Sequence, residues 1–247
     1  MKDDVLLLNG WGATCSLWGS IIPVLSSSFQ INCVESSWAK HDVSIANIDN
    51  YIEGLVEQLN SAVHIVAWSM GGLIAIRLAT RLPEFVTSIH FISSVPNFVS
   101  DENQYAGIDS RWFRNFVEAY EKSPIKTLKN FLVLQAKGDR RAKLVLDNLK
   151  NSLKIEDINF EELRYGLDML RSSDFSEELV NLTCKKFFIH GDHDAVVNIE
   201  AARFVAEINK SRLHVIEGAG HVPHVSGVVE VAEIIKNNLL SVDHGSI

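Results

Sequence analysis

Short runs of apolar residues alternate with longer segments of helical periodicity along most of this chain. The apolar runs predict β-strands that are buried on both faces of a sheet. The six predicted strands span residues 5–8, 31–35, 63–67, 88–93, 186–190 and 212–217. Helical patterns lie at residues 16–25, 48–59, 71–82, 199–208 and 228–240. This alternation predicts an α/β fold with a mostly parallel sheet and helices on both faces.

One long segment, residues 97–176, interrupts the alternation. It contains no predicted strand, and its apolar residues recur at the helical spacing of three and four. The three apolar stripes are Trp112, Phe113, Phe116, Val117 and Tyr120; Leu128, Phe131, Leu132 and Gln135; and Val145, Leu146, Leu149 and Leu153. We therefore predict a core formed by residues 1–96 and 177–247, with residues 97–176 inserted between two strands as a helical cap.

Three residues that could act together follow three of the predicted strands. Ser69 follows the third strand, Asp194 the fifth and His221 the sixth. Right-handed crossovers bring the carboxyl ends of parallel strands to one edge of the sheet, so we expect these side chains to meet. A serine alcohol is a weak nucleophile until a base takes its proton, and a carboxylate usually orients that base. The order Ser, Asp, His therefore predicts a nucleophilic catalytic triad.

The segment Ala67-Trp68-Ser69-Met70-Gly71 lies between a predicted strand and a predicted helix. A serine on such a sharp turn is a nucleophile elbow, usually written Gly-x-Ser-x-Gly because the flanking residues lie very close together. Alanine is the next smallest residue after glycine, and we interpret Ala67 as a tolerated variant. The alternative interpretation is an ordinary strand–turn–helix in which the serine caps the helix.

Other residues compete for two of these roles. Asp192 lies two residues before Asp194 and could instead be a turn residue that binds its own backbone. His224 lies three residues after His221, and we expect it to face the entrance or solvent. The remaining histidines of the predicted strands are expected to be packed or surface side chains. No cluster of histidine, cysteine or acidic residues has metal-ligand spacing, so the sequence predicts no metal and no cofactor.

These motifs together resemble those of the α/β-hydrolase fold family, and the resemblance covers essentially the whole chain. Several segments are similar to the methyl ester esterases that act on pimeloyl-acyl carrier protein in biotin synthesis. These segments are Leu8–Gly12, Ala67–Gly72, Phe131–Gln135, Gly191–Val196 and Gly220–Pro223. The resemblance implies a serine esterase with the triad Ser69, His221 and Asp194. It also implies an oxyanion hole made by the backbone N–H groups of Trp11 and Met70.

The same resemblance implies where a substrate would bind. Trp11, Met70 and the segment Phe131–Gln135 would line an acyl channel beside Ser69 and His221. The segment comprises Phe131, Leu132, Val133, Leu134 and Gln135. These residues lie on a predicted helix and cannot all face one pocket, so we expect at least one of the apolar ones to belong to the core.

Two departures from the family pattern concern the loops around the site. The family usually has histidine where this chain has Asn9, which leaves open how the loop after the first strand is held. Residues 35–40 lack the glycine-rich loop that is common in the family, and Trp38 is a candidate to fill the space.

Charge is unevenly distributed along the chain. The formal net charge of −8 argues against non-specific nucleic-acid binding. Residues 111–154 nevertheless carry 11 basic against 4 acidic residues, a net charge of +7, which leaves −15 for the remainder. A solvated helical face is one interpretation. The resemblance implies another, in which the cap holds an acidic acyl carrier protein.

The expected docking residues on the cap are Lys126, Lys129, Arg140, Arg141, Lys143 and Lys150. Lys126 and Lys143 are the two whose motif spacing best supports this role.

The cysteines and the first residues of the chain indicate the cellular compartment in which we expect the protein. Cys15, Cys33 and Cys184 are separated and odd in number, which predicts reduced thiols rather than disulfides. No apolar run is long enough to span a bilayer, and the first residues lead directly into a strand without a signal-peptide pattern. We therefore expect a monomeric cytoplasmic protein that binds neither membranes nor nucleic acid.

Other functions fit the same motifs. A general short-chain carboxylesterase or thioesterase, or a hydrolase of carbon–carbon bonds, would use the same triad under a helical lid. A non-catalytic receptor with this fold would hold a ligand under the cap, but the intact triad argues against that function. Fold alone does not decide among them.

Overall fold

The fold is built on one parallel six-stranded sheet. The computed structural model describes residues 2–34, 48–57, 59, 61–100 and 107–243. The strands are β1 (Asp4–Leu8), β2 (Gln30–Val34), β3 (Val63–Trp68), β4 (Val86–Ile92), β7 (Lys185–Gly191) and β8 (Leu213–Ile216), in the order β2-β1-β3-β4-β7-β8. All six predicted strands are present within two residues of their expected limits, and the predicted fold class is confirmed. The prediction for residues 35–40 and Trp38 concerns residues outside the described part of the chain.

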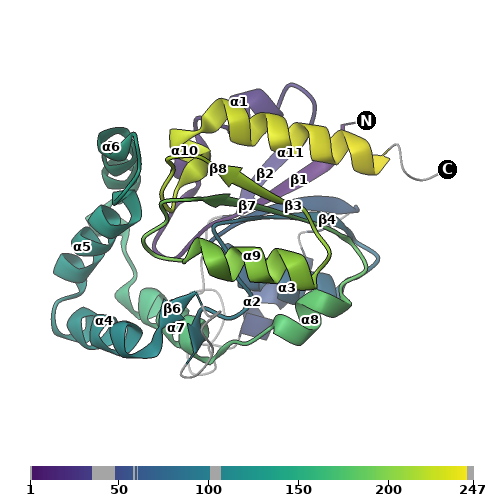
Figure 1. The fold of residues 1–247 in the computed structure, drawn as a ribbon. Helices are drawn as coiled ribbons and strands as arrows, with labels where there is room; N and C mark the ends of the chain where they lie inside the picture. Colours follow the sequence, from purple (N-terminus) through teal and green to yellow (C-terminus); the bar gives the residue numbers. More distant parts are fainter. Residues whose placement is uncertain (1, 35–47, 58, 60, 101–106, 244–247) are drawn as a thin grey trace.

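Helices cover both faces of this sheet (Figure 1). One face carries α2 (Ile48–Val56), α3 (Gly71–Arg81), α8 (Ser176–Asn181) and α9 (Ile199–Ile208). The other carries η1 (Cys15–Trp18), α1 (Ile22–Leu25) and α11 (Val228–Asp243). Side chains of a strand point alternately to its two faces, so Leu6 and Leu8 of β1 pack in one core cluster while Val5 and Leu7 pack in the other.

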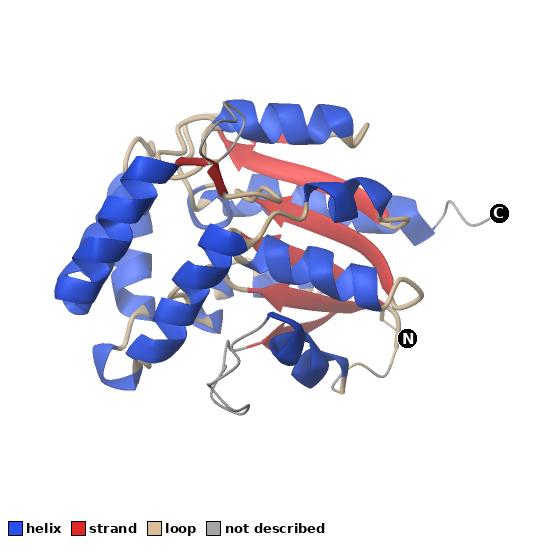
Figure 2. Cartoon of the chain, turned by 90° about the horizontal axis from the view of Figure 1, so that it is seen from below, coloured by secondary structure: helices blue, strands red, loops and turns tan. Residues whose placement is uncertain are grey.

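Most of the chain between β4 and β7 is helical. It contains α4 (Ser110–Lys122), α5 (Pro124–Ala136), α6 (Ala142–Ser152), η4 (Ile155–Asp157) and α7 (Phe160–Ser172). Helices α4, α5 and α6 coincide with the three predicted stripes, whereas α7 was not among the predicted helices. The expectation of no strand is wrong, because β5 (Val99–Ser100) and β6 (Ile108–Asp109) form a short parallel pair. Figures 1 and 2 show α4–α7 beyond the carboxyl ends of the sheet strands.

The predicted helix over residues 16–25 is two short helices, η1 and α1. Pro23 lies in the first turn of α1, where a missing N–H group costs no hydrogen bond. Within the described part of the chain, no helix has the length and apolar character needed to cross a membrane.

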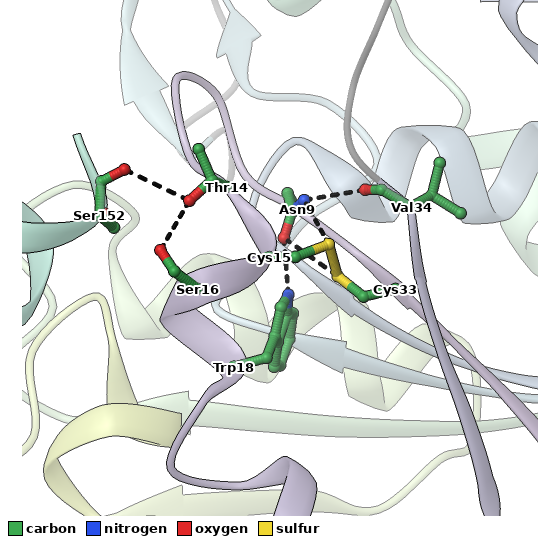
Figure 3. Close-up of a disulfide and its surroundings, with 8 residues drawn as sticks. All are labelled: Asn9, Thr14, Cys15, Ser16, Trp18, Cys33, Val34 and Ser152. Carbon is green, nitrogen blue, oxygen red and sulfur yellow. Dashed lines mark hydrogen bonds between the residues drawn. A yellow bond between two sulfur atoms is a disulfide. The ribbon is translucent and has the colours of Figure 1, made fainter. Parts of the chain in front are cut away.

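A disulfide joins Cys15 and Cys33 (Figure 3). Strands β1 and β2 are neighbours with Leu7 opposite Cys33, and the chain after β1 bends back so that Cys15 reaches the same edge. The prediction of reduced thiols is therefore wrong for these two residues, although Cys184 is free. The two cysteines are 18 residues apart in the sequence, and only the pairing of β1 with β2 brings them close enough to form a disulfide. The cysteines no longer support the cytoplasmic prediction.

Asn9 holds the loop after β1 in place through its side-chain amide, at the position where the family usually has histidine. Its side-chain oxygen accepts a 2.6 Å hydrogen bond from Trp18 Nε1, and its Nδ2 donates to the carbonyl of Val34 at 2.9 Å. Asn9 is 2% exposed, so these bonds form away from water. The amide therefore ties the ends of β1 and β2 to η1 (Figure 3).

Within the described part of the chain, the side chains of His90 and His224 are fully buried, and no side chain forms a hydrogen bond with either ring. His90 stacks on Phe187 within the sheet, and His224 stacks on Trp18 with their ring centroids 4.4 Å apart. The expectation that His224 faces the entrance is wrong, because α10 (Pro223–Ser226) turns its ring inward against η1. Burial, assisted by neighbouring histidines, lowers the pKa of each ring to about 3.

These two histidines predict a loss of stability in mild acid. An unfolded histidine has a pKa of about 6.5, so between pH 6.5 and pH 3 the unfolded chain binds more protons than the folded one. The free energy of unfolding should therefore fall as the pH drops below 6.5, by about 2 kcal/mol per histidine at pH 5. Urea unfolding at pH 7.5 and pH 5 measures this fall. His90→Phe should remove about half of it, and equal stability of the parent protein at both pH values would contradict the assignment.

Candidate active site

Ser69 occupies a strained turn between β3 and α3. Its φ is +54°, in the left-handed region that side chains other than glycine rarely adopt. The turn is held because Ser69 N donates to the carbonyl of Ile92 at 2.9 Å. A Cβ on Gly71 would lie 2.6 Å from the carbonyl oxygen of Leu8, so the position requires glycine. The fully buried Ala67 occupies the other tight position of the elbow.

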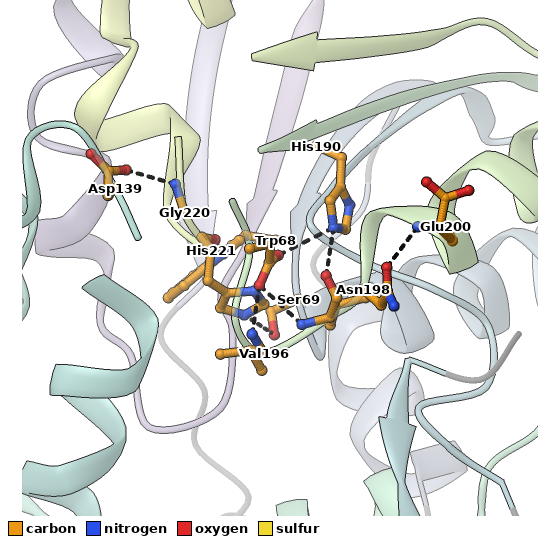
Figure 4. Close-up of polar contacts among 11 residues, drawn as sticks. Trp68, Ser69, Asp139, His190, Val196, Asn198, Glu200, Gly220 and His221 are labelled. Atoms are coloured by element: carbon orange, nitrogen blue, oxygen red, sulfur yellow. Dashed lines mark hydrogen bonds and ion pairs between the residues drawn. The ribbon is translucent and has the colours of Figure 1, made fainter. Parts of the chain in front are cut away.

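The structure brings together the three residues that the strand ends predicted. His221 Nε2 lies 3.0 Å from Ser69 Oγ, and His221 Nδ1 lies 2.8 Å from Asp194 Oδ2. Ser69 is 7% exposed and His221 is fully buried. Figure 4 shows the Ser69 and His221 side chains facing each other at the carboxyl edge of the sheet. The imidazole can therefore take a proton from the hydroxyl on one side while the carboxylate holds its other nitrogen.

Asp194 is held as a carboxylate. Its Oδ1 accepts hydrogen bonds from the backbone N–H groups of Val196 and Val197 at 2.8 and 2.9 Å. Burial raises the pKa of this carboxyl, but the charge and hydrogen bonds of His221 and His190 outweigh burial and bring the pKa well below its ordinary value. Asp192, the competing acid, accepts a bond from Gly218 N at 2.6 Å and so serves the loop.

A second histidine, His190, touches the same carboxylate. Its Nε2 lies 3.2 Å from Asp194 Oδ2 and 3.0 Å from the carbonyl oxygen of Val197. Both neighbours are acceptors, so Nε2 must carry the proton that it shares between them. The sequence predicts His190 to be a packed or surface residue of a strand. The sequence feature that could have indicated its contact with Asp194 is its position at the end of β7, four residues before Asp194.

The loop that carries His221 is fixed through its backbone. His221 N donates to the carbonyl of Gln135, and the carbonyl of His221 accepts a 2.8 Å bond from Trp68 Nε1. Gly220 N donates to Asp139 Oδ2 at 2.8 Å (Figure 4). Asp139 belongs to the turn between α5 and α6 and was not foreseen. The helices between β4 and β7 therefore hold the imidazole in place.

The loop containing Trp11 lies directly against the elbow. A Cβ on Gly10 would be 3.1 Å from Ser69 Cβ, so the backbone just before Trp11 lies in close contact with the elbow. Trp11 Nε1 donates to the carbonyl of Leu163 in α7 at 2.7 Å, and its ring packs edge-on against Phe131. Met70 is the N-cap residue of α3, where the positive end of the helix dipole lies.

The segment predicted to line the acyl channel has mixed surroundings. Phe131 is half-buried against Trp11, and Leu134 is also half-buried. Leu132 packs in the core, as at least one of the apolar residues was expected to do. Gln135 is buried at 2% exposure, and Val133 is 55% exposed.

The basic residues expected to dock a carrier divide into two groups. Four are exposed side chains on α5 and α6, namely Lys126, Lys129, Lys143 and Lys150. The two arginines are also exposed, but they lie beside the His221 loop: Arg141 Nη1 donates to the carbonyl of Ser226 at 2.9 Å, and Arg140 N donates to the carbonyl of Gly218 at 2.7 Å.

The described residues of the chain can be compared with the ligand sets of metal sites. Among them, no group of three or more histidine, cysteine, aspartate and glutamate side chains is arranged to hold a metal ion.

The fold is shared with several solved structures. A bromoperoxidase from Bacillus anthracis superimposes with a TM-score of 0.86 at 19% identity, over 97% of this chain and 92% of that chain. An esterase from Exiguobacterium antarcticum gives 0.83 at 21% identity, over 96% and 91% of the two chains. At these levels of sequence identity, the similarity shows a shared fold and nothing more specific.

Relatives by sequence carry a more specific name. The chain is 29% identical over 227 residues to a protein of Nitrosomonas europaea named pimeloyl-[acyl-carrier protein] methyl ester esterase, with 90% of each chain covered. It is 29% identical over 228 residues to a protein of the same name from Aliivibrio salmonicida, covering 91% of this chain and 87% of that one. The resemblance identified from the sequence motifs is thereby confirmed.

A model of a protein family matches most of the chain. The model described as the alpha/beta hydrolase fold matches residues 5–228, which include the sheet except its first residue, Asp4, and all three strand-end residues. The observed strand order and the elbow at Ser69 agree with that match. The chain therefore belongs to the α/β-hydrolase fold family.

Proposed function

We propose that this protein is a serine carboxylic ester hydrolase that cleaves the methyl ester of pimeloyl-acyl carrier protein. The main observation in support of ester hydrolysis is the contact of His221 with both other residues. His221 Nδ1 lies 2.8 Å from Asp194 Oδ2, and His221 Nε2 lies 3.0 Å from Ser69 Oγ. The choice of ester is supported by the shared name of relatives that align along nearly the whole chain.

In the proposed reaction, Ser69 Oγ attacks the ester carbonyl while His221 Nε2 takes the hydroxyl proton. Asp194 keeps Nδ1 protonated and stabilises the imidazolium that forms. The carbonyl oxygen becomes an oxyanion, which accepts hydrogen bonds from the backbone N–H groups of Trp11 and Met70. Each such donor is worth roughly 10²–10³ in rate in enzymes of this kind.

The tetrahedral intermediate then collapses. The carbon–oxygen bond to the alcohol breaks, and His221 returns its proton to the leaving methanol, which leaves an acyl-enzyme on Ser69. Water attacks this ester in the second half of the reaction, with His221 again acting as the base. The products are the free acid and methanol.

The carrier protein is a proposed partner because of the charge on α5 and α6. An acyl carrier protein is strongly acidic, and complementary charge speeds association and fixes orientation. The protein has a net charge of −8, so only a local basic surface could attract an acidic partner. The exposed lysines of α5 and α6 supply such a surface near the site.

A direct test combines a cell assay with a defined substrate. A biotin-requiring bacterial strain that lacks this esterase should grow without biotin when it expresses the protein. The purified protein should release methanol from the carrier-bound methyl ester. Failure of both, with retained hydrolysis of p-nitrophenyl acetate, would leave a general esterase and reject the substrate assignment.

Charge reversal on the helices should separate the carrier from the chemistry. Lys126→Glu and Lys143→Glu should each lower kcat/KM for the carrier-bound ester by about tenfold, because each places a negative charge opposite an acidic partner. Hydrolysis of p-nitrophenyl acetate should stay within a factor of two.

The matched control is Lys185→Glu, since Lys185 is exposed at the opposite end of β7. It should change neither activity. Equal losses on both substrates, or an equal effect of the control, would contradict carrier docking on these helices.

His190 is expected to position Asp194. His190→Leu removes the N–H donor and should lower kcat about tenfold with little change in KM, since the imidazole orientation matters chiefly in the transition state. The acidic limb of the pH–rate profile should move to higher pH, because a carboxylate that has lost a donor stabilises the imidazolium of His221 more strongly.

His190→Gln keeps an N–H group and should restore most of the rate. His90→Leu is the control, since His90 is equally buried in the next strand and touches none of the three site residues. A His190→Leu profile identical to the parent would remove the positioning role.

A further inference from the structure

Helix α7 packs directly against the two residues whose N–H groups would bind the oxyanion. Gly166 is a buried residue of α7, and a Cβ on it would lie 2.6 Å from Trp11 Cδ1 and 3.3 Å from Met70 Sδ. Two carbon atoms in favourable contact lie about 3.5–4.0 Å apart. The helix can therefore approach Trp11 this closely only because residue 166 has no side chain.

The helix itself gives no reason for a glycine at this position. Gly166 lies at the middle of α7 (Phe160–Ser172), where glycine is, after proline, the least favourable residue and alanine the most favourable. Gly166 is not among the glycines with a positive φ, so its backbone conformation does not require glycine either. What requires it is the contact with Trp11.

Two hydrogen bonds to α7 fix the indole against the helix. Trp11 Nε1 donates to the carbonyl of Leu163 at 2.7 Å. Tyr120 packs edge-on against the indole with the ring centroids 5.7 Å apart, and its hydroxyl donates to the carbonyl of Phe160 at 2.7 Å. Trp11 is 5% exposed. The indole therefore has little freedom to turn away from an atom added at position 166.

Free space beside these residues determines how such a clash would be relieved. A cavity of about 450 Å³ borders Trp11, Met70 and Gly166. An indole pushed by a methyl group can move into this cavity, and the fold need not open. The Trp11 backbone would move with the indole, although the preceding residue, Gly10, lies against Ser69. The distance from the Trp11 N–H to the reacting carbonyl would therefore change.

We propose that Gly166 and the carbonyl of Leu163 are positioning groups for the oxyanion hole, because they fix the place of the Trp11 N–H relative to Ser69. This inference rests on the proposed ester hydrolysis and deepens it. Both groups act through Trp11, and Gly166 acts through Met70 as well. Oxyanion stabilisation depends on donors that are already in place, so a displaced donor lowers the rate without weakening substrate binding.

Gly166→Ala is the first test. It should lower kcat for p-nitrophenyl acetate by about 30-fold with KM changed by less than about twofold, since both halves of the reaction pass through an oxyanion. The inhibition constant of trifluoroacetophenone, which forms an oxyanion on Ser69, should rise by the same factor. Titration of the active sites to completion with a fluorophosphonate corrects for any misfolded fraction.

The matched control is Arg164→Ala, which introduces the same residue on the exposed side of the same helix. It should change kcat and the inhibition constant by less than about twofold.

A double-mutant cycle tests whether the effect passes through the indole. In a Trp11→Leu background, Gly166→Ala should lower kcat by less than about threefold, because the added methyl no longer meets a ring. Trp11→Phe keeps a ring but loses the bond to the Leu163 carbonyl, and it should lower kcat by about fivefold. This variant also covers a folding failure of Gly166→Ala.

A kcat and an inhibition constant of Gly166→Ala within threefold of the parent would overturn the proposal. An undiminished effect of this change in the Trp11→Leu background would overturn it as well, and so would an unchanged kcat in Trp11→Phe. Absence of any hydrolysis of p-nitrophenyl acetate by the parent protein would instead reject the proposed function itself.

Discussion

Ser69→Ala is expected to lower kcat for ester hydrolysis by about 10⁶-fold, because it removes the attacking oxygen and leaves His221 without a proton to accept. The fold should survive, since the backbone of Ser69 is held by bonds from its own N–H to Ile92 and from Ser94 to its carbonyl. Hydrolysis of p-nitrophenyl acetate measures the change, after separation from any contaminating host esterase.

Ser94→Ala is the matched control for Ser69→Ala. Ser94 is a buried serine whose Oγ donates to the Ser69 carbonyl at 2.7 Å, so its loss disturbs the elbow without removing the nucleophile. The control should lose no more than about tenfold. Activity of Ser69→Ala within a hundredfold of the parent would exclude Ser69 as the nucleophile.

Asp194→Asn should lower kcat by about 10⁴-fold while leaving the site geometry nearly intact. The amide can still accept from Val196 and Val197 through its oxygen, but its nitrogen then faces His221 and favours the wrong tautomer of the ring. The negative charge that stabilises the imidazolium is lost as well. Steady-state kinetics from pH 6 to pH 9 would record the effect.

Asp192→Asn serves as the control for the acid, because Asp192 lies two residues away and binds Gly218 N rather than His221. Its amide oxygen can still accept that bond, so activity should fall less than threefold. If the two variants lost equal activity, the assignment of the acid to Asp194 would be wrong.

The features that follow from strand order were predictable from the sequence. Short apolar runs gave the six strands because burial on both faces leaves few polar residues in them. Parallel strands end at one edge, so Ser69, Asp194 and His221 could be brought together without knowing any distance. The helix boundaries of α9 were also predicted to the residue.

The features that depend on contacts across the fold were not predictable. The disulfide of Cys15 and Cys33 needs β1 beside β2 and a loop that turns back, which no local pattern encodes. His224 follows a proline, a common signal for an exposed turn, yet Trp18 and Trp68 enclose its ring. His190 has the pattern of a strand residue, and only the turn after β7 brings Asp194 against it.

For the helices between β4 and β7, the sequence predicted the positions along the chain better than the surfaces that each helix contacts. Their stripes located α4, α5 and α6, whereas no stripe indicated that α6, the connection and α7 line part of the cavity beside Trp11 and Met70. A helix presents only one side to a pocket, and periodicity alone does not tell which surface that side meets. The division into core and cap stays a prediction.

The most direct test of the account is covalent labelling with a fluorophosphonate probe, followed by peptide mass spectrometry. The probe phosphonylates a serine only when a base activates its hydroxyl. The account predicts a single adduct on Ser69 that forms at least a thousandfold more slowly in His221→Ala. Labelling at another residue, or none in the folded parent protein, would contradict the claim that Ser69, His221 and Asp194 act as one nucleophilic unit.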